Sequence, residues 1–285
     1  MSEPENLLFQ EHPYSGKVYH LEADPSLNLD LSEIRQNLSG ASVSVSGDFK
    51  FEDDDGVIIP EVFQPEKGKK PNEAKIDQVS GFNQRGINGI VGYVNHNDPR
   101  TISFQDKEVF IMESVRTLFA IFEVRGEHYL SMLGARSVVN SVLELISEIL
   151  EGFGFRTRNI EISHGGFEEI VDNMVDSLKT TTVSGYSSPN IDKKVIRGSD
   201  YEGEPEYERE ARIGNVSGHQ FGTEVVGDTG IKTVQIAGDG LVRSYSSVPL
   251  IDYIDMVANY VLDAQIQIQS SLASFGAEDS RALND

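Results

Sequence analysis

The sequence predicts an α+β fold with a largely antiparallel sheet and about four main helices, which leaves room for two lobes. Three observations predict it. Many short segments alternate apolar and polar residues, as half-buried strands do. Turn residues such as Gly126 and Asp239-Gly240 separate neighbouring segments in the manner of hairpins. Four longer segments carry apolar residues at helical spacing.

The first 65 residues predict a small acidic, β-rich N-terminal lobe. Residues 17–22 and 41–46 alternate as strands, and residues 30–38 predict a helix that begins at an aspartate cap. An acidic turn at 53–56 then separates two short strand-like pieces.

Residues 66–80 predict a linker or an exposed loop. The stretch 66–75 reads EKGKKPNEAK, with four lysines together with glycine, proline and glutamate. This composition is typical of a solvated connection between structural units.

Residues 81–269 predict the main α+β domain. Residues 118–122 form a continuous apolar run suited to a buried strand, and 129–133 can return as its partner. The further elements follow in chain order: a helix at 135–151, a strand at 155–163, a helix at 166–178, strands at 194–197, 211–216, 221–226, 232–237 and 241–245, and a helix at 249–269. Residues 201–210 predict an exposed acidic loop, and residues 270–285 predict a frayed tail.

Composition restricts the class of protein. The chain of 285 residues has a formal net charge of −22 and contains no cysteine, which excludes disulfides, thiolate zinc sites and cysteine nucleophiles. No apolar run reaches 18 residues and the N-terminus lacks a signal-peptide pattern, so we expect a cytoplasmic protein without membrane association. The high acidity, together with few lysines, resembles the proteins of salt-in halophilic archaea, whose cytosolic salt screens such charge.

Charge is distributed unevenly along the chain. Residues 66–165 hold 13 acidic and 12 basic side chains, whereas the flanking parts are strongly acidic. This asymmetry can indicate a surface that faces an anion or a partner, although a core-rich segment would also have fewer surface acids. The predicted contacts with an anion or nucleic acid are Lys67, Lys69, Lys70, Lys75, Arg85, Arg156 and Arg158. Phe82 and Tyr93 lie near Arg85 in sequence and could stack bases, but their alternation also suits a core strand.

Three functions follow as alternatives. The first is a non-enzymatic binding or assembly module that engages nucleic acid or a protein partner, with no cofactor and no metal. The second is a metal-dependent hydrolase: Asp55 and, 18 residues later, Glu73 and Lys75 resemble in spacing the PD-(D/E)xK nuclease pattern. That resemblance implies that carboxylates bind a divalent cation and that a lysine stabilises developing charge. In that family the Glu-x-Lys pair lies on an apolar core strand, whereas here PNEAKIDQ is hydrophilic and predicts a loop.

The third alternative is a self-assembling structural protein that forms homo-oligomers through its amphipathic helices.

Overall fold

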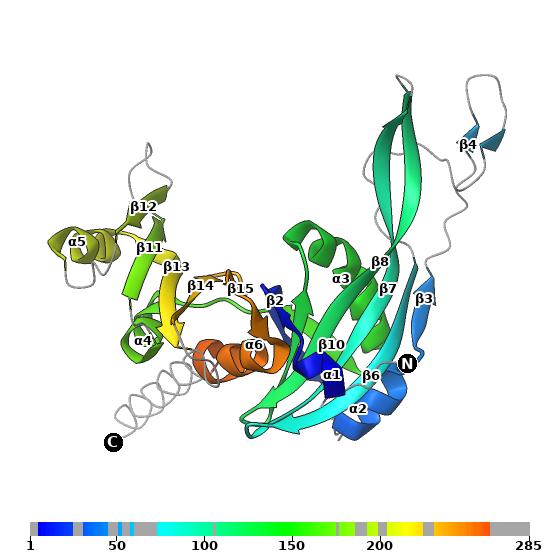
Figure 1. Cartoon of the computed structure of the whole chain (residues 1–285), viewed down its shortest axis with the longest axis horizontal. Helices are drawn as coiled ribbons and strands as arrows, with labels where there is room; N and C mark the ends of the chain where they lie inside the picture. The colour runs from blue at the N-terminus through cyan, green and yellow to red at the C-terminus, as the bar shows by residue number, and fades with distance from the viewer. Residues whose placement is uncertain are drawn as a thin grey trace, which may run out of the picture.

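The computed structural model describes residues 5–24, 31–44, 51–52, 58–59, 73–104, 107–174, 177–185, 193–198, 204–224 and 231–262. These residues form a mixed α and β fold (Figure 1). Asp55, Lys67, Lys69, Lys70 and the tail at 270–285 lie outside the described residues.

The described part of the chain contains six α-helices and one π-helical segment. They are α1 (Glu5–Leu8), α2 (Leu31–Leu38), α3 (Arg136–Glu151), α4 (His164–Met174), α5 (Pro205–Ile213), α6 (Leu250–Met256) and η2 (Val257–Leu262). Four of them, α2, α3, α4 and α6 with η2, correspond to the predicted main helices. The prediction of 166–178 was too long, because Ser177 already belongs to the next strand. No helix in these ranges is long and apolar enough to cross a membrane.

Sixteen strands account for most of the described structure. They are β1 (Glu11–His12), β2 (Ser15–Ala23), β3 (Ser42–Ser44), β4 (Phe51–Glu52), β5 (Ile58–Ile59), β6 (Glu73–Gln84), β7 (Ile87–Phe104), β8 (Lys107–Val124), β9 (Glu127–Leu133), β10 (Phe155–Asn159), β11 (Ser177–Ser184), β12 (Lys193–Arg197), β13 (Asn215–Glu224), β14 (Ile231–Ala237), β15 (Leu241–Ser244) and β16 (Val248–Pro249).

Twelve of these strands form one large sheet. Its order is β12-β11-β13-β14-β15-β2-β9-β8-β7-β6-β3, and β10 also pairs with β2. All pairs of neighbouring strands in the described part of this sheet are antiparallel, so the predicted largely antiparallel α+β class is confirmed. Strand β2, from the predicted N-terminal lobe, pairs with β9, β10 and β15 of the predicted main domain, so the sheet joins these two parts of the chain.

The prediction of a loop at 66–80 was wrong for its last part, because β6 begins at Glu73. Ala74 and Ile76 are buried, whereas Glu73, Lys75 and Asp77 are exposed. The segment therefore alternates as a half-buried strand does. The strand was not predicted because only two apolar residues, Ala74 and Ile76, alternate within an otherwise hydrophilic segment.

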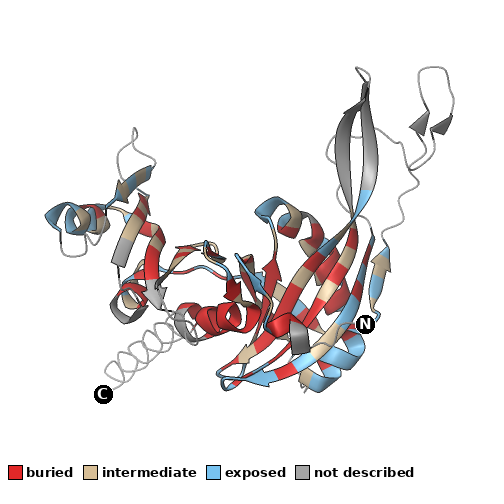
Figure 2. Cartoon of the chain, in the orientation of Figure 1, coloured by how far each residue is buried: buried red, intermediate tan, exposed pale blue. Residues whose placement is uncertain are grey.

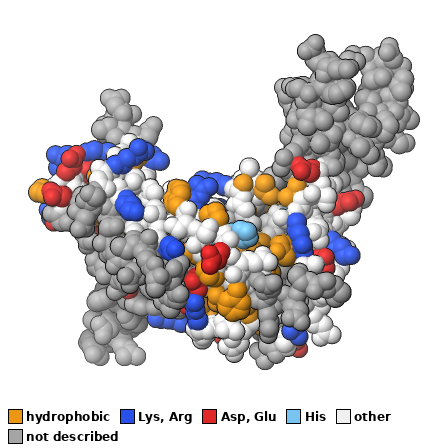
Figure 3. Space-filling model, in the orientation of Figure 1, with side chains coloured by type: hydrophobic (Ala, Val, Ile, Leu, Met, Phe, Trp, Pro, Cys, Tyr) orange, Lys and Arg blue, Asp and Glu red, His pale blue; other side chains and the backbone are white. Residues whose placement is uncertain are grey.

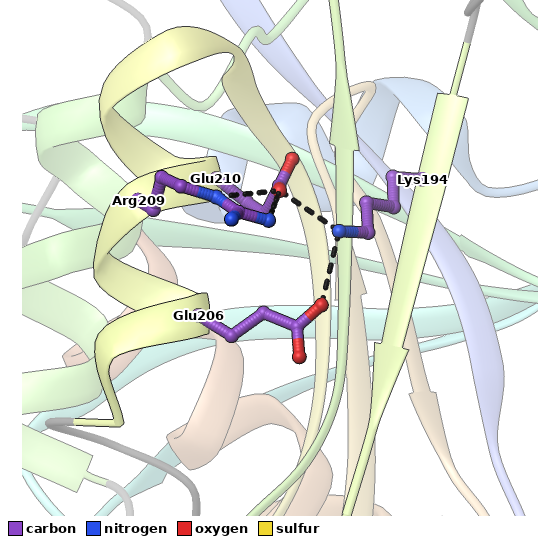
Figure 4. A network of polar contacts seen from close by, with 4 residues as sticks. All are labelled: Lys194, Glu206, Arg209 and Glu210. Atoms are coloured by element: carbon purple, nitrogen blue, oxygen red, sulfur yellow. Dashed lines mark hydrogen bonds and ion pairs between the residues drawn. The ribbon is translucent and has the colours of Figure 1, made fainter.

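The acidic stretch before β13 is also helical where a loop at 201–210 and a strand at 211–216 were expected. Helix α5 has Pro205 in its first turn, a position that proline favours, and early acids that suit the positive end of the helix dipole. Figure 4 shows how α5 is attached to the sheet: Lys194 of β12 contacts Glu206 at 3.1 Å and Glu210 at 2.8 Å. Arg209 contacts the same Glu210 carboxylate at 2.7 Å.

Buried residues are concentrated on the central strands of the large sheet (Figure 2). On β8, Phe119 and Ile121 pack in a cluster with α2 and α3, whereas Ala120 and Phe122 pack in a second cluster with α6 and η2. This alternation is what a strand buried on both faces requires. We call the two sides of the sheet the α3 face and the α6 face.

A β-bulge changes the facing of β6 midway. The register shifts between Asp77 and Ser80, and Gln78 has a φ of 53°. Ile76 belongs to the cluster on the α3 face, and Phe82, six residues later, belongs to the cluster on the α6 face. Positions six apart would share a face in a regular strand, so the extra residue of the bulge is what moves Phe82 to the other side.

Candidate functional site

A pocket of about 390 Å³ lies at the β3 edge of the large sheet. Most of its polar lining comes from Ser42, Ser44, Glu73, Lys75, Asn95, Asn97 and Ser114. The pocket lies where β6 begins; beyond it, β7 and β8 continue as a paired arm past their neighbours (Figure 1).

Strand register places a row of polar residues across this edge. Ser42 pairs with Lys75, Lys75 with Asn95, and Asn95 with Arg116. Directly opposed residues in antiparallel strands share a face, so the four side chains lie side by side on the α6 face. We call Ser42, Lys75, Asn95 and Arg116 the polar row.

Arg116 has a defined position within the polar row. Its guanidinium carbon lies 3.6 Å from the centroid of the Tyr93 ring, and Nη2 donates a hydrogen bond to Gln78 Oε1 at 2.5 Å. The cation–π contact and the hydrogen bond together hold the guanidinium at the Tyr93 ring. Arg116 is exposed and Tyr93 is half-buried.

Glu73 and Lys75 both line the pocket, so the structure brings together two of the residues singled out from sequence. The backbone N–H of Glu73 donates to Asn97 Oδ1 at 3.2 Å. Lys75 makes no side-chain hydrogen bond or ion pair with another described residue. Glu73 is the one carboxylate among the described lining residues, and that part of the chain contains no group of three or more metal-ligating His, Asp or Glu.

His96 also lines the pocket, and it pairs across the strands with buried Ala74. It is 3% exposed, and its Nε2 lies 2.9 Å from Thr117 Oγ1. A buried imidazole held between strands orders the backbone of β7 and β8 beneath Asn95 and Asn97.

Arg85 lies away from this pocket, in the turn between β6 and β7. Its Nη2 lies 2.5 Å from Asp252 Oδ1, and its Nη1 lies 4.0 Å from Asp255 Oδ2. The predicted anion contact is thus already next to two carboxylates of helix α6.

Arg156 and Arg158 lie on β10, which four strands separate from β6. Arg158 Nη2 lies 2.9 Å from Glu22 Oε2. Arg156 lines a pocket of about 650 Å³ whose wall also contains Asp24 and Glu151. These carboxylates weaken the attraction of an anion to both arginines.

Sequence reasoning missed Asn95, Asn97, Ser114 and Arg116. The alternation in YVNHN, which puts Tyr93, Asn95 and Asn97 on one side, is the signal that could have found the first two. Of the two aromatic residues considered, Phe82 is only 9% exposed and packs against Gly89, while Tyr93 carries Arg116.

Basic and acidic side chains are interspersed on the face that Figure 3 shows, with hydrophobic side chains gathered between them. A polyanion that approached this face would therefore meet small, separate groups of basic side chains rather than a broad basic patch. No protein-family model matches the chain, and no curated protein matches it.

Proposed function

We propose that this chain is a non-enzymatic binding module that engages single-stranded nucleic acid through the polar row. The observation that carries the proposal is the registered alignment of Lys75, Asn95 and Arg116, with Arg116 stacked on Tyr93. The resemblance of its composition to halophile proteins supports a cytoplasm of high salt as its setting.

Each member of the polar row suits a different part of a nucleotide. The Lys75 ammonium suits a phosphate, and the outer face of the Arg116 guanidinium suits stacking by a base. The Asn95 amide and the Ser42 hydroxyl can donate to and accept from base edges. Adjacent strands lie about 4.8 Å apart, so the row spans roughly 14 Å across four strands, which suits a short unpaired stretch.

The net charge of −22 opposes binding at low salt. At about 1 M salt the Debye length falls to about 3 Å, so distant acids are screened while direct contacts at the row persist. Stacking and hydrogen bonds therefore contribute more of the affinity here than long-range attraction does.

Fluorescence anisotropy with labelled single-stranded RNA and DNA in molar KCl tests the proposal. We expect the double variant Lys75→Ala/Arg116→Ala to bind at least about tenfold more weakly, because a stacked base alone contributes about 1–3 kcal/mol. The matched control is Lys193→Ala/Arg197→Ala, which removes the same charge from the exposed edge strand β12.

Equal weakening by both double variants would assign the effect to net charge and reject the polar row. An absence of nucleic-acid binding, with a defined protein bound at the row instead, would retain a binding module and reject nucleic acid. Lys67, Lys69 and Lys70 precede β6 and stay predicted contacts; replacing them with alanine together with Lys75 should weaken binding further without unfolding the chain.

A metal-dependent hydrolase is a second candidate because of one observation. Glu73 and Lys75 point from the exposed side of a strand with buried Ala74 between them, as in a Glu-x-Lys pair carried by a β-strand. Such an enzyme would hydrolyse nucleic acid only with Mg²⁺ or Mn²⁺ and would lose that activity in Asp55→Ala and in Glu73→Ala. Glu148→Gln, at an exposed position of α3, is the matched control.

A further inference from the structure

A second, larger pocket lies on the α3 face of the sheet, opposite the side that carries the polar row. It has a volume of about 720 Å³ and lies between helix α2 and the ends of strands β6 to β9. This volume is in the range of small-molecule sites. Leu31, Phe82 and Ile90 supply apolar wall, and the polar lining comes from Ser32, Arg35, Asn83, Asn88, Glu123 and His128.

Four polar side chains cross the floor of this pocket on four successive strands. Asn83 of β6 pairs with Asn88 of β7, and Glu123 of β8 pairs with His128 of β9. Gly89 of β7 pairs with Phe122 of β8. Asn88 precedes Gly89 and Glu123 follows Phe122, so Asn88 and Glu123 also lie opposite each other on these antiparallel strands. All four residues line the pocket.

Arg35 of helix α2 supplies a cation at the other side of the pocket. A Cβ atom at Gly81 would lie 3.3 Å from Arg35 Nη1, so the guanidinium lies directly over this glycine. A larger residue at position 81 would have to displace it. The absence of a side chain at Gly81 therefore leaves room for Arg35 at the pocket wall.

The polar groups of this pocket have few internal partners. Within the described ranges, the side chains of Arg35, Asn83, Asn88 and Glu123 make no hydrogen bond or ion pair with the protein. In contrast, Arg85, Arg116, Arg136 and Arg158 each contact a carboxylate or an amide. The donors and acceptors at this site are thus available to a ligand.

The arrangement sets the length of a suitable ligand. Gly81 of β6, Ile90 of β7 and Ile121 of β8 lie side by side across three strands. Glu123 is two residues beyond Ile121 on β8, and β8 is two strands away from Gly81 on β6. Strand spacing and rise then separate the Arg35 guanidinium from the Glu123 carboxylate by on the order of 10 Å. A nucleoside monophosphate carries its phosphate and its base edge at opposite ends, so it can offer an anion to Arg35 and N–H donors to Glu123.

We propose that this pocket binds a guanine nucleoside monophosphate. The phosphate accepts hydrogen bonds from Arg35, as guanidinium groups favour. The adjacent N1–H and N2–H groups of guanine donate to the Glu123 carboxylate, and the amides of Asn83 and Asn88 complete the base edge. Burial lowers the pKa of His128, so its neutral imidazole can donate or accept one further hydrogen bond.

Isothermal titration of the full chain in molar KCl tests this site with four probes: guanosine 5′-monophosphate, adenosine 5′-monophosphate, guanosine and inorganic phosphate. We expect the guanine nucleotide to bind at least about tenfold more tightly than the other three. Arg35→Ala should reduce its affinity to that of guanosine and leave guanosine binding unchanged. Glu123→Gln should remove the preference for guanine over adenine.

Arg156→Ala and Glu148→Gln are matched controls, since each removes the same charge at an exposed position outside the pocket. Circular dichroism confirms that each variant folds. Absence of nucleotide binding, or binding that Arg35→Ala and Glu123→Gln change no more than the controls do, overturns the proposal. Titration with mononucleotides and the Arg35→Ala and Glu123→Gln variants reports on this pocket, whereas anisotropy with labelled RNA reports on the polar row, so failure here is distinguishable from failure of the polar row.

Discussion

Arg85 Nη2 lies 2.5 Å from Asp252 Oδ1 and thereby joins the turn between β6 and β7 to helix α6. The Asp252 and Asp255 side chains are only 2% and 6% exposed. A buried carboxylate is strongly disfavoured without a nearby cation. The positive charge of Arg85 therefore stabilises the packing of α6 on the sheet.

Two hairpin turns provide a matched test of this role. Arg85-Gly86 and Arg125-Gly126 both have positive φ values, 53° and 77° in the first turn and 52° and 85° in the second. Asparagine suits the first position of such a turn better than arginine does. We expect Arg85→Asn to lower the free energy of unfolding by about 3 kcal/mol, because the buried carboxylates lose their cation. Arg125→Asn should change it by less than about 1 kcal/mol. Urea denaturation measures both, and equal effects would contradict the role of the ion pair.

A second prediction concerns the attachment of helix α5 to β12. Glu206 and Glu210 both contact Lys194, but the Glu210 side chain is 5% exposed and that of Glu206 is 66% exposed. Glu210→Gln replaces the buried carboxylate that accepts hydrogen bonds from Lys194 and Arg209 with a neutral amide, which accepts more weakly, and should lower the free energy of unfolding by about 1–3 kcal/mol. Glu206→Gln should cost less than about 0.5 kcal/mol, since exposed ion pairs contribute little. Thermal unfolding of the two variants side by side checks this difference, and similar losses would show that burial of Glu210 does not matter.

The elements predicted well from sequence are those whose signals are local. The hairpin of β8 and β9 followed by α3 combines a long apolar run, a glycine turn and an uninterrupted helical repeat. The β14–β15 hairpin at Asp239-Gly240 is likewise confirmed. Helix α5 was missed because its apolar stripe is narrow, with Tyr207 and Ala211 only partly buried among charged neighbours.

The candidate sites could be predicted only in part for a similar reason. Glu73 and Lys75 are two residues apart on one strand, so their common face follows from local sequence once the strand is recognised. The alignment of Lys75 with Asn95 and Arg116 depends on the register of three strands. The part of that register between β6 and β7 depends on the Arg85-Gly86 turn and on the bulge after Asp77, which shifts the pairing by a residue. Neither feature has a distinctive signature in composition.

The third prediction concerns stability in mild acid and depends on His219. This residue is 2% exposed, its Nδ1 lies 2.9 Å from Thr181 Oγ1, and its ring packs edge-on against Phe167. Burial, and then the nearby His164, lowers the pKa of His219 from 6.5 to about 4. Above the unfolded pKa of 6.5 the imidazole is neutral in both states, and its contribution to stability is fully present. As pH falls from there toward 4, the unfolded chain takes up a proton that the folded chain does not, so stability declines.

Between about pH 7.5 and pH 5 this linkage should remove about 2 kcal/mol from the free energy of unfolding. His219→Asn keeps a polar group near Thr181 but cannot titrate, so its stability should depend less steeply on pH by that amount. Urea denaturation of both proteins at each pH, in the same salt, measures the difference. Parallel pH profiles would mean that His219 takes up a proton in the folded state as readily as in the unfolded chain. Its burial would then not exclude the charged form.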